Sequence, residues 1–384
     1  MSEPLDTYIT RRHVLKVGAI GATAALCGAC LSPSNARAAA SSQSLRHLAA
    51  AKGIVFGASL AVHELDRPHG ARYAELYKSD AAIITSELEF KMSSLRPAVD
   101  RLDFSQADRL VDFALHNQMS VRGHTLIWND DLPAWIKGLG PGEVEHLLES
   151  HIMTVLERYR GKVEYWDVVN EPIAPWDKKP DNLRDGPYYS ALGEGYIARA
   201  FKLAREFAPT SKLVLNEAQT ETDDANGEVF RTSLLSLVKR LKEQGVPIDA
   251  IGLQAHLKAT APYDFGKFAD FAGSLGNLGF DVHITELDVN DTGIGGPISG
   301  RDATVADLYE RFLNAVLQVP AVKVVQTWQI ADGTSWMRDP LASSRMGIRA
   351  KARPLLYDET FRKKPAWEAV ARAFSTAPTR KLAR

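Results

Sequence analysis

Two glutamates that follow apolar segments are the residues of this chain best placed for acid–base chemistry. Glu171 ends the apolar run in WDVVNEP, and Glu286 lies in ITELDV. Hydrolysis of a glycosidic bond uses such a pair, because one carboxyl group protonates the leaving oxygen while the other attacks the anomeric carbon or activates water. Either glutamate alone is better explained as a solvated strand end. Together, with Asn170 beside one and Asp288 beside the other, they favour the chemical interpretation.

The spacing around Glu286 indicates how the two carboxyl groups differ. Side chains alternate along a strand with a period of two, so Glu286 and Asp288 share a face, as do Gln254 and His256. We expect His256 to hydrogen-bond Glu286 while Asp288 orients the imidazole, which keeps Glu286 ionised as a nucleophile requires. Glu171 must instead begin the reaction protonated, in a drier setting.

Short apolar segments alternate along the chain with longer segments of helical period. The eight predicted strands are 54–58, 81–85, 120–125, 163–169, 212–215, 250–254, 281–285 and 322–327. The predicted helices are 104–117, 143–159, 197–207, 230–244, 265–275, 305–317 and 365–374. Such alternation gives an open doubly wound sheet or a closed eight-stranded barrel. Because the glycine-rich nucleotide fingerprint is missing and the strand count is eight, we expect an α/β fold, a (β/α)8 TIM barrel in a single domain.

Polar and aromatic residues follow seven of the predicted strands. They are Glu87, Glu89 and Lys91; His124 and Trp128; Asn170 and Glu171; Asn216 and Glu217; Gln254 and His256; Glu286 and Asp288; and Trp328. Barrel enzymes place their chemistry at the carboxyl ends of strands, so the sequence predicts one cleft lined by these residues. Two simpler explanations stay open, a satisfied core histidine for His124 and an ion pair with a lysine such as Lys91 for Glu171.

Four tryptophans are candidates either for the core or for the cleft wall: Trp128, Trp135, Trp328 and Trp336. Trp328 and Trp336 follow the last predicted strand in TWQIADGTSW, on the face where the cleft is expected. An indole offers an apolar face on which a sugar ring stacks. We therefore expect Trp328 and Trp336 to line the cleft.

The N-terminal segment has the features of an export signal. A twin-arginine stretch at 10–16, TRRHVLK, precedes an apolar run over 17–31 that is too short and too rich in Ala and Gly to span a membrane. A cleavage pattern, ARA at 36–38, predicts removal of residues 1–38 and a catalytic domain over 39–384. We expect a periplasmic or secreted protein exported by the twin-arginine route; the alternative is a cytoplasmic protein with a basic N-terminus.

Both cysteines, Cys27 and Cys30, lie in this segment, so the exported chain would have neither a thiol nor a disulfide. Its stability must then come from a large hydrophobic core. Acylation of Cys30 in a lipoprotein is an alternative, but the leucine usual three positions earlier is absent. The formal net charge of −1 indicates no nucleic-acid partner. We expect a monomer without stable membrane association.

Taken together, the motifs resemble those of the glycoside hydrolase family 10 endo-1,4-β-xylanases. WDVVNEP resembles the acid/base motif and ITELDV the nucleophile motif. RGHTLIW with LPAW resembles the third-strand segment, IDAIGLQAHL the sixth strand and PLLYDETFRKKPAW the C-terminal stretch, in the family's order from about 57 to 373. The resemblance implies a retaining double displacement through a covalent glycosyl-enzyme on xylan or xylo-oligosaccharides, with no metal and no cofactor.

The resemblance also implies roles for single residues. Glu171 would be the general acid/base, Glu286 the nucleophile, and Asn170 would contact the 2-hydroxyl of the sugar that is attacked. His124, Asn216, Gln254, His256 and Asp288 would orient the carboxylates and that sugar. Glu87, Lys91, Trp128, Trp328 and Trp336 would line the subsites on the non-reducing side.

Several positions near the expected subsites depart from the family pattern, although the two glutamates do not. Leu88 replaces Asn, Met92 replaces Trp, Asn129 replaces His, Asp131 replaces Gln, and Gln329 replaces the Gly after Trp328. The fifth-strand motif reads Asn216-Glu217-Ala218-Gln219 instead of Asn-Asp-Tyr-Asn. Loss of the amide at Leu88 removes a hydrogen-bonding group from the second subsite, so we expect a preference for decorated, short or atypical chains.

A cluster of basic residues follows the last predicted strand: Arg338, Arg345, Arg349, Lys351 and Arg353. One hypothesis is that this loop contacts glucuronate on decorated xylan, and the simpler explanation is a solvated loop.

Two other functions stay open, a related retaining barrel hydrolase that acts on β-1,4-glucan and a non-catalytic periplasmic carbohydrate-binding barrel. The set Glu87, Lys91, His124 and Trp128 fits xylanases better than glucanases. The presence of both candidate carboxylates argues against the non-catalytic alternative.

Overall fold

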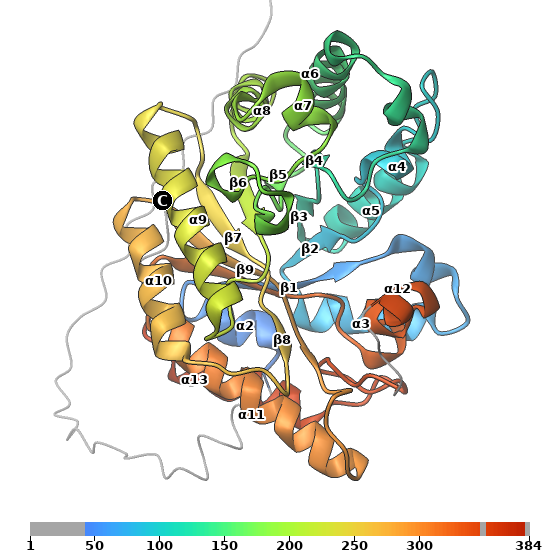
Figure 1. Cartoon of the computed structure of the whole chain (residues 1–384). Coiled ribbons are helices and arrows are strands. Elements are labelled where there is room, and N and C mark those ends of the chain that lie inside the picture. The colour runs from blue at the N-terminus through green and yellow to red at the C-terminus, as the bar shows by residue number, and fades with distance from the viewer. Residues whose placement is uncertain (1–42, 346–350, 381–384) are drawn as a thin grey trace, which may run out of the picture.

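A closed parallel barrel with helices around it is the architecture of this chain in its computed structural model (Figure 1). The structure describes residues 43–345 and 351–380, so the predicted export segment with both cysteines lies outside the described residues. The barrel strands are β1 (Val55–Leu60), β2 (Ile83–Ser86), β3 (Ser120–Gly123), β5 (Tyr165–Asn170), β6 (Lys212–Glu217), β7 (Ala250–Leu253), β9 (Asp281–Asn290) and β10 (Val322–Thr327). They run in the order β10-β1-β2-β3-β5-β6-β7-β9, and parallel pairing of β9 with β10 closes the sheet. The closure excludes the open doubly wound sheet and confirms the predicted (β/α)8 barrel.

Helices connect the strands and cover the outside of the barrel (Figure 1). The main helices are α2 (Leu45–Ala50), α3 (Gly70–Asp80), α5 (Ser105–His116), α6 (Pro141–Arg158), α8 (Gly195–Phe207), α9 (Ala225–Glu243), α10 (Phe265–Asn277), α11 (Ile298–Val316) and α13 (Pro365–Thr376). Shorter elements are α4 (Met92–Leu95), α7 (Pro187–Leu192), α12 (Pro340–Arg345), β4 (Ile127–Trp128) and β8 (His256–Lys258). The 3-10 turns are η1 (Val62–Asp66), η2 (Ala134–Gly138), η3 (Pro175–Asp177), η4 (Pro180–Asn182), η5 (Asp332–Thr334) and η6 (Trp336–Arg338). All seven predicted helices are present, and α9 and α11 begin earlier than predicted.

Two of the main helices, α2 and α3, are not predicted by the sequence pattern, and α3 shows the reason. Its buried side includes Tyr73, Ala74 and Tyr77 instead of an aliphatic stripe. The two tyrosine hydroxyls hydrogen-bond each other at 2.8 Å, and Tyr77 donates to the backbone carbonyl of Ser59 at 2.5 Å. Because the hydroxyls find partners only after folding, a pattern based on apolar residues misses this helix.

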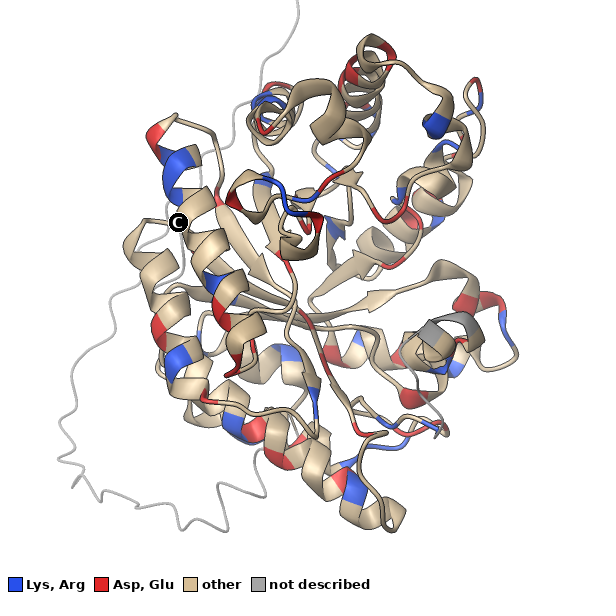
Figure 2. Ribbon diagram, in the orientation of Figure 1, with Lys and Arg blue, Asp and Glu red and all other residues tan. Residues whose placement is uncertain are grey.

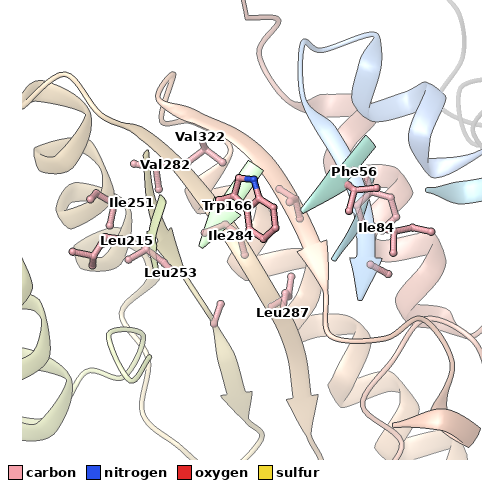
Figure 3. Packing of buried hydrophobic residues seen from close by; sticks show 14 of the residues in the cluster. Phe56, Ile84, Trp166, Leu215, Ile251, Leu253, Val282, Ile284, Leu287 and Val322 are labelled. Atoms are coloured by element: carbon pink, nitrogen blue, oxygen red, sulfur yellow. The ribbon is translucent and has the colours of Figure 1, made fainter. Parts of the chain in front are cut away.

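The outer faces of the strands pack against the helices and form one large core (Figure 3). Trp166 of β5 is fully buried there and meets Phe90 edge to face at a centroid distance of 5.0 Å. Gly123 of the neighbouring strand lies so close that a Cβ atom would sit 2.1 Å from the Trp166 ring. The bulky indole is therefore accommodated by a glycine on β3, which fixes the packing of the two strands.

The inside of the barrel is polar above a small apolar layer. Ile83, Tyr165 and Val324 form a separate cluster inside. Arg122, which is completely buried, donates to Asp167 at 2.9 Å and lies 3.1 Å from His283. A buried charge requires a partner, and this ion pair joins β3 to β5 inside the barrel.

Charges of both signs are interspersed along the outer helices, as Figure 2 shows for α9, α10 and α11. Within residues 43–345 and 351–380, no helix combines the length and the apolar character needed to cross a membrane.

Candidate active site

Irregularities in β5 and β9 direct the two glutamates toward the same end of the barrel. In its carboxyl half β9 has one residue more than its partner β10. The adjacent residues Thr285 and Glu286 therefore both reach the side chain of Asn216, each at 2.8 Å, which strict alternation would not allow. β5 has a similar irregularity relative to β6 just before Asn170. Bulges re-aim side chains in this way and are frequent beside active sites.

Left-handed backbone at non-glycine residues marks three of the strand ends. The φ angles are 52° at Glu171, 62° at Ala255 and 66° at Gln329. Such conformations cost about 1–3 kcal/mol each and persist where the surrounding structure imposes them. Ala255 lies between Gln254 and His256 and has left-handed backbone. The alternation of side chains in a regular strand therefore does not apply to this pair. Both side chains nevertheless reach the carboxylates.

Glu286 is buried and held by neutral and charged donors. Its Oε1 accepts from Asn216 Nδ2 at 2.8 Å, and its Oε2 lies 3.2 Å from Nε2 of His256. Burial alone would raise the pKa of Glu286, but the hydrogen bond with His256 and the fields of His124 and His256 hold that pKa below its usual value. The environment therefore favours the ionised carboxylate.

His256 bridges two acidic side chains. Its Nδ1 lies 2.9 Å from Asp288 Oδ1, and Asp288 Oδ2 in turn accepts from the indole nitrogen of Trp336 at 2.8 Å. Burial lowers the pKa of His256, but the carboxylates of Asp288 and Glu286 outweigh burial and raise it well above the usual value. A protonated imidazole thus faces the ionised Glu286.

Glu171 lies at the end of β5 and has three side-chain donors around it. Gln254 Nε2 donates to its Oε1 at 2.9 Å, and Trp128 Nε1 donates to its Oε2 at 3.0 Å. The third donor is Arg184, whose guanidinium lies 3.3 Å from Oε2 and also donates to the Glu171 carbonyl at 2.7 Å. The cationic neighbour of Glu171 is therefore Arg184, whereas the Lys91 ammonium lies over the Trp128 ring, 5.0 Å from its centre.

Two of the predicted cleft residues have a buried polar atom without a protein partner, Nδ2 of Asn170 and Oε2 of Glu87. The other ends of these groups are fixed, because Asn170 Oδ1 accepts from Asn216 at 2.9 Å and Glu87 Oε1 accepts from Gln329 at 2.6 Å. Burial raises the pKa of Glu87 to about 8, although Lys91 and Gln329 act in the opposite direction. An unpaired buried polar group costs about 1–3 kcal/mol, a cost that a ligand hydroxyl would remove.

The histidine and the tryptophans take different positions. His124 is buried, with Nδ1 2.9 Å from Asp167 Oδ2 and its ring 5.3 Å from that of Trp328. Trp328 is mostly buried, whereas Trp336 is half-buried and lies 5.2 Å from the His256 ring. Trp135 donates to the backbone carbonyl of Arg96 at 3.1 Å and does not contact the carboxylates.

Two of the residues that depart from the family pattern, Asp131 and Met92, hydrogen-bond residues of neighbouring loops and short helices. Asp131 accepts from the amide and the hydroxyl of Ser93, which anchors the start of α4. Met92 is buried and its sulfur accepts from the Tyr188 hydroxyl at 3.5 Å. Leu88 is 39% exposed and offers no hydrogen-bonding side chain.

Gln329, in the place of the expected glycine, connects two predicted subsite residues. Its amide nitrogen donates to Glu87, and its amide oxygen accepts from the backbone nitrogen of Trp336 at 2.8 Å. Its own backbone nitrogen donates to the Ser59 hydroxyl at 2.8 Å. The side chain at this position thus hydrogen-bonds both the Glu87 carboxylate and the backbone of Trp336 and fixes their positions.

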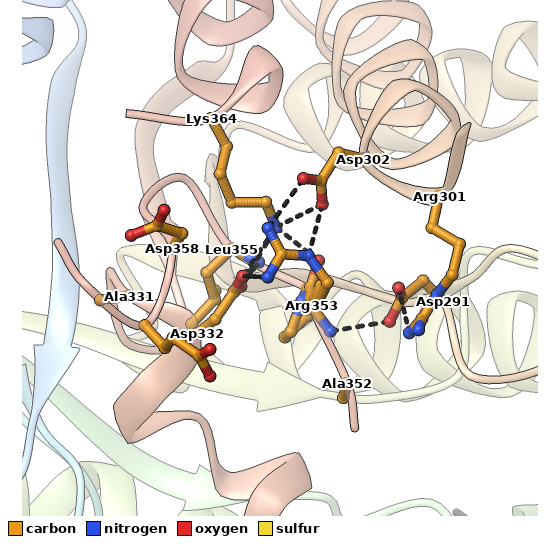
Figure 4. A network of polar contacts seen from close by, with 12 residues as sticks. Asp291, Arg301, Asp302, Ala331, Asp332, Ala352, Arg353, Leu355, Asp358 and Lys364 are labelled. Atoms are coloured by element: carbon orange, nitrogen blue, oxygen red, sulfur yellow. Dashed lines mark hydrogen bonds and ion pairs between the residues drawn. The ribbon is translucent and has the colours of Figure 1, made fainter. Parts of the chain in front are cut away.

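The basic loop after β10 does not present all its charges to solvent. Arg353 pairs with Asp302 at 2.8 Å in a network that also holds Lys364 and Asp332 (Figure 4). Arg338 donates to Glu359 at 3.0 Å, and Lys351 pairs with the same carboxylate. Arg349 and the side chain of Arg345 lie outside the described part. The described basic residues therefore serve ion pairs within the protein, which weakens the glucuronate hypothesis.

Sequence reasoning missed Arg184, Asp167 and the buried Arg122. Asp167 lies within WDVVNEP and is signalled only by a polar residue inside an apolar run. Arg184 lies in a loop after β5, and no sequence pattern connects it to Glu171. Within the described ranges, no group of three or more His, Cys, Asp or Glu side chains is arranged to hold a metal ion.

Comparisons with known proteins agree with this geometry. The family described as "Glycosyl hydrolase family 10" matches residues 44–373. Endo-1,4-beta-xylanase B of Thermotoga neapolitana is 30% identical over 85% of this chain and 90% of its own length. Endo-1,4-beta-xylanase 3 of Hypocrea jecorina is 33% identical over 86% of this chain and 85% of its own.

Solved structures show the same similarity. The native xylanase 10B of Thermotoga maritima superposes with a TM-score of 0.78 at 30% identity, over 86% of this chain and 98% of that chain. Xylanase 10B of Thermotoga petrophila RKU-1, solved in complex with xylobiose, gives a TM-score of 0.77 at 30% identity, over 86% of this chain and 97% of that chain.

Proposed function

Because the chain belongs to glycosyl hydrolase family 10, we propose that its cleft performs retaining endo-hydrolysis of β-1,4-xylosidic bonds with Glu171 and Glu286 in different roles. The enzyme is an endo-1,4-β-xylanase that acts on xylan or xylo-oligosaccharides. What supports the division of roles is that the surroundings favour the ionised form of one carboxyl group, Glu286, while the other lies at the open end of a strand.

The first step forms a glycosyl-enzyme. An oxygen of Glu286 attacks the anomeric carbon, the bond from this carbon to the leaving oxygen breaks, and Glu171 transfers its proton to that oxygen. Asn216 and His256 hold the attacking carboxylate, and His256 keeps it ionised until attack. Asn170 Nδ2, which has no protein partner, is placed to bind the 2-hydroxyl of the attacked sugar.

The second step releases the sugar with its original configuration. Glu171, now a carboxylate, removes a proton from water, the water oxygen attacks the same carbon, and the bond to Glu286 breaks. Gln254, Trp128 and Arg184 donate to Glu171, so they stabilise the charge that it acquires after the first step.

Product analysis on xylan, xylo-oligosaccharides and β-glucan tests this function. We expect xylobiose and xylotriose from xylan, with the β-anomer formed first as seen by proton NMR. Release of glucose oligomers from β-glucan at an equal rate would favour the related glucanase, and initial formation of the α-anomer would exclude retention. Comparison of linear with decorated xylan tests whether Leu88 directs the enzyme toward atypical chains.

Export and oligomeric state are further proposals. We propose that the twin-arginine segment directs the enzyme to the periplasm or the medium and that it works as a monomer. Fractionation of cells that produce the full chain and an Arg11→Lys/Arg12→Lys variant tests export, because the variant should remain in the cytoplasm. Equal export of both proteins would contradict the proposal. Light scattering of the purified enzyme measures its mass in solution.

A further inference from the structure

A hollow of about 480 Å³ lies on the flank of the barrel that carries α4 and α6 (Figure 1). The loop after α4, the turn η2 and the amino-terminal half of α6 surround it, and its lining consists chiefly of Arg96, Val99, Trp135, Leu139, Glu143 and Leu147. None of the described residues that line it hydrogen-bonds Glu171 or Glu286. The hollow is therefore separate from the cleft of the two carboxylates.

Arg96 brings a buried positive charge to this hollow. It is only 9% exposed, and its Nε donates to Nδ1 of His151 at 3.2 Å. In the other buried arginines of the described part, a terminal nitrogen donates to a carboxylate or to a backbone carbonyl, as it does in Arg122, Arg184, Arg231 and Arg380. The terminal nitrogens of Arg96 have no such acceptor among the described residues. Its charge is therefore left without a protein counter-ion, although a buried charge is costly when it is unpaired.

The histidine beside Arg96 does not compensate this charge. His151 is completely buried, and burial together with the charge of Arg96 lowers its pKa to about 3, so the imidazole is neutral at neutral pH. Its Nδ1 accepts from Arg96, so the ring proton lies on Nε2, which has no partner among the described residues. A neutral acceptor of this kind satisfies one of the five donors of a guanidinium and supplies no negative charge.

The walls beside Arg96 are apolar. The indole nitrogen of Trp135 donates to the backbone carbonyl of Arg96 at 3.1 Å, which fixes the indole next to the arginine. Leu139 and Leu147 extend the apolar lining, and Val99 on the loop after α4 is 63% exposed. A hollow of this size, with apolar walls and one charged anchor, is typical of sites for small organic ligands.

The remaining charge of the lining limits the ligand to a single negative charge. Glu143 lies in the first turn of α6, and its Oε2 accepts from the backbone nitrogen of Gly140 at 2.7 Å. This carboxylate would repel a phosphate or a dicarboxylate. A monocarboxylate instead matches the guanidinium of Arg96 in a bidentate pair, and a flat aromatic ring matches the indole of Trp135.

We propose that this hollow binds a small aromatic monocarboxylate, whose carboxylate pairs with the Arg96 guanidinium while its ring packs against Trp135. The site is additional to the carbohydrate cleft, and the proposal does not depend on the proposed function. A bound acid supplies the counter-ion that the described residues do not provide.

A ligand-observed NMR titration with trans-cinnamate tests the site. We expect the wild-type enzyme to bind cinnamate with a Kd of about 1 mM, as suits a ligand of this size, and the uncharged cinnamamide at least about tenfold more weakly. Arg96→Met keeps a long side chain without the charge, so it should weaken cinnamate binding at least about tenfold. Arg96→Lys should retain part of the affinity, because it keeps the charge and loses the bidentate geometry.

The matched control is Arg372→Met, which removes an arginine paired with Glu310 on the outside of the barrel and should leave the affinity for cinnamate unchanged. Xylotriose, which competes for the cleft, should not displace cinnamate. No binding to the wild type, equal binding by Arg96→Met, equal binding of cinnamamide or displacement by xylotriose would overturn the proposal. Thermal unfolding followed by circular dichroism shows whether each variant is folded. If Arg96→Met does not fold, the comparison of cinnamate with cinnamamide on the wild type and on Arg96→Lys decides.

Discussion

The two glutamates of the cleft are held in contrasting ways. Glu286 lies within the ten-residue strand β9, its side chain is 6% exposed, and its partners are Asn216 on β6 and His256 on β8. Glu171 follows the end of β5, its side chain is 15% exposed, and one of its partners is Arg184 from a loop. The carboxylate proposed as the nucleophile is thus built into the barrel wall, whereas the carboxylate proposed as the acid/base lies at its edge.

Removal of the Glu286 carboxylate should have the largest effect on activity. Glu286→Ala is expected to lower kcat on xylan on the order of 10⁴-fold or more, because no nucleophile remains. A suitable control is Glu310→Ala, which removes a half-buried glutamate paired with Arg372 on the outside of the barrel and should leave kcat unchanged. Substantial activity of the Glu286 variant would refute the assignment of the nucleophile.

Removal of the edge-held carboxylate should depend on the substrate. Glu171→Ala is expected to lower kcat/KM on xylan about 10²- to 10⁴-fold, the range of general acid–base catalysis. On dinitrophenyl xylobioside the first step needs no acid, so a burst of phenol followed by slow turnover is expected in stopped-flow measurements. Equal slowing of the burst and of turnover on xylan would contradict the proton-transfer role.

The rigidity of the Glu286 side can be tested without touching the glutamate. At Gly252 of β7 an added Cβ would lie 2.2 Å from Asn216 Oδ1 and would push away the amide that holds Glu286. Gly252→Ala should therefore reduce kcat about 10²-fold, which is the loss of rate that a misplacement of about 1 Å causes.

Gly273→Ala is the matched control for this substitution. Gly273 lies in α10 with no atom within 4 Å of the added methyl group, so the change should keep kcat and stabilise the helix by about 0.5–1 kcal/mol. An unchanged kcat for Gly252→Ala would show that Asn216 tolerates displacement.

The pH dependence of kcat/KM should show the smallest of these effects. The pKa of Glu286 is held below its usual value although burial opposes this, so activity should persist at a pH below the usual glutamate pKa. His256→Asn removes a hydrogen bond and a positive charge that lower the pKa of Glu286. The acid limb of kcat/KM should therefore move to higher pH, and kcat/KM at neutral pH should fall about tenfold or less. His116→Asn, at the exposed end of α5, serves as control. An acid limb that stays in place would exclude His256 as the cause.

The positions of the strands could be predicted from the sequence because each is a short apolar run between helical segments. The alternation also predicted that the chemistry would follow the strands, at Asn170, Glu171 and Glu286. The sequence pattern did not predict the helix α3, because its buried tyrosines carry hydroxyl groups whose partners, such as the Ser59 carbonyl, come from another element. Local periodicity is a property of a few consecutive residues, so it is readable without the fold.

The partners of these residues were decided by the tertiary structure. Arg184 reaches Glu171 through a loop, Gln329 braces Glu87 from the last strand, and Arg96 lines a hollow together with α6. Each contact depends on strand register, on bulges and on how loops return to the barrel. The sequence by itself determined which strand ends carry carboxyl, amide and aromatic side chains, because this follows from local patterns. Only the folded barrel determined which donors surround each carboxylate, because residues distant in the chain become neighbours through closure of the sheet.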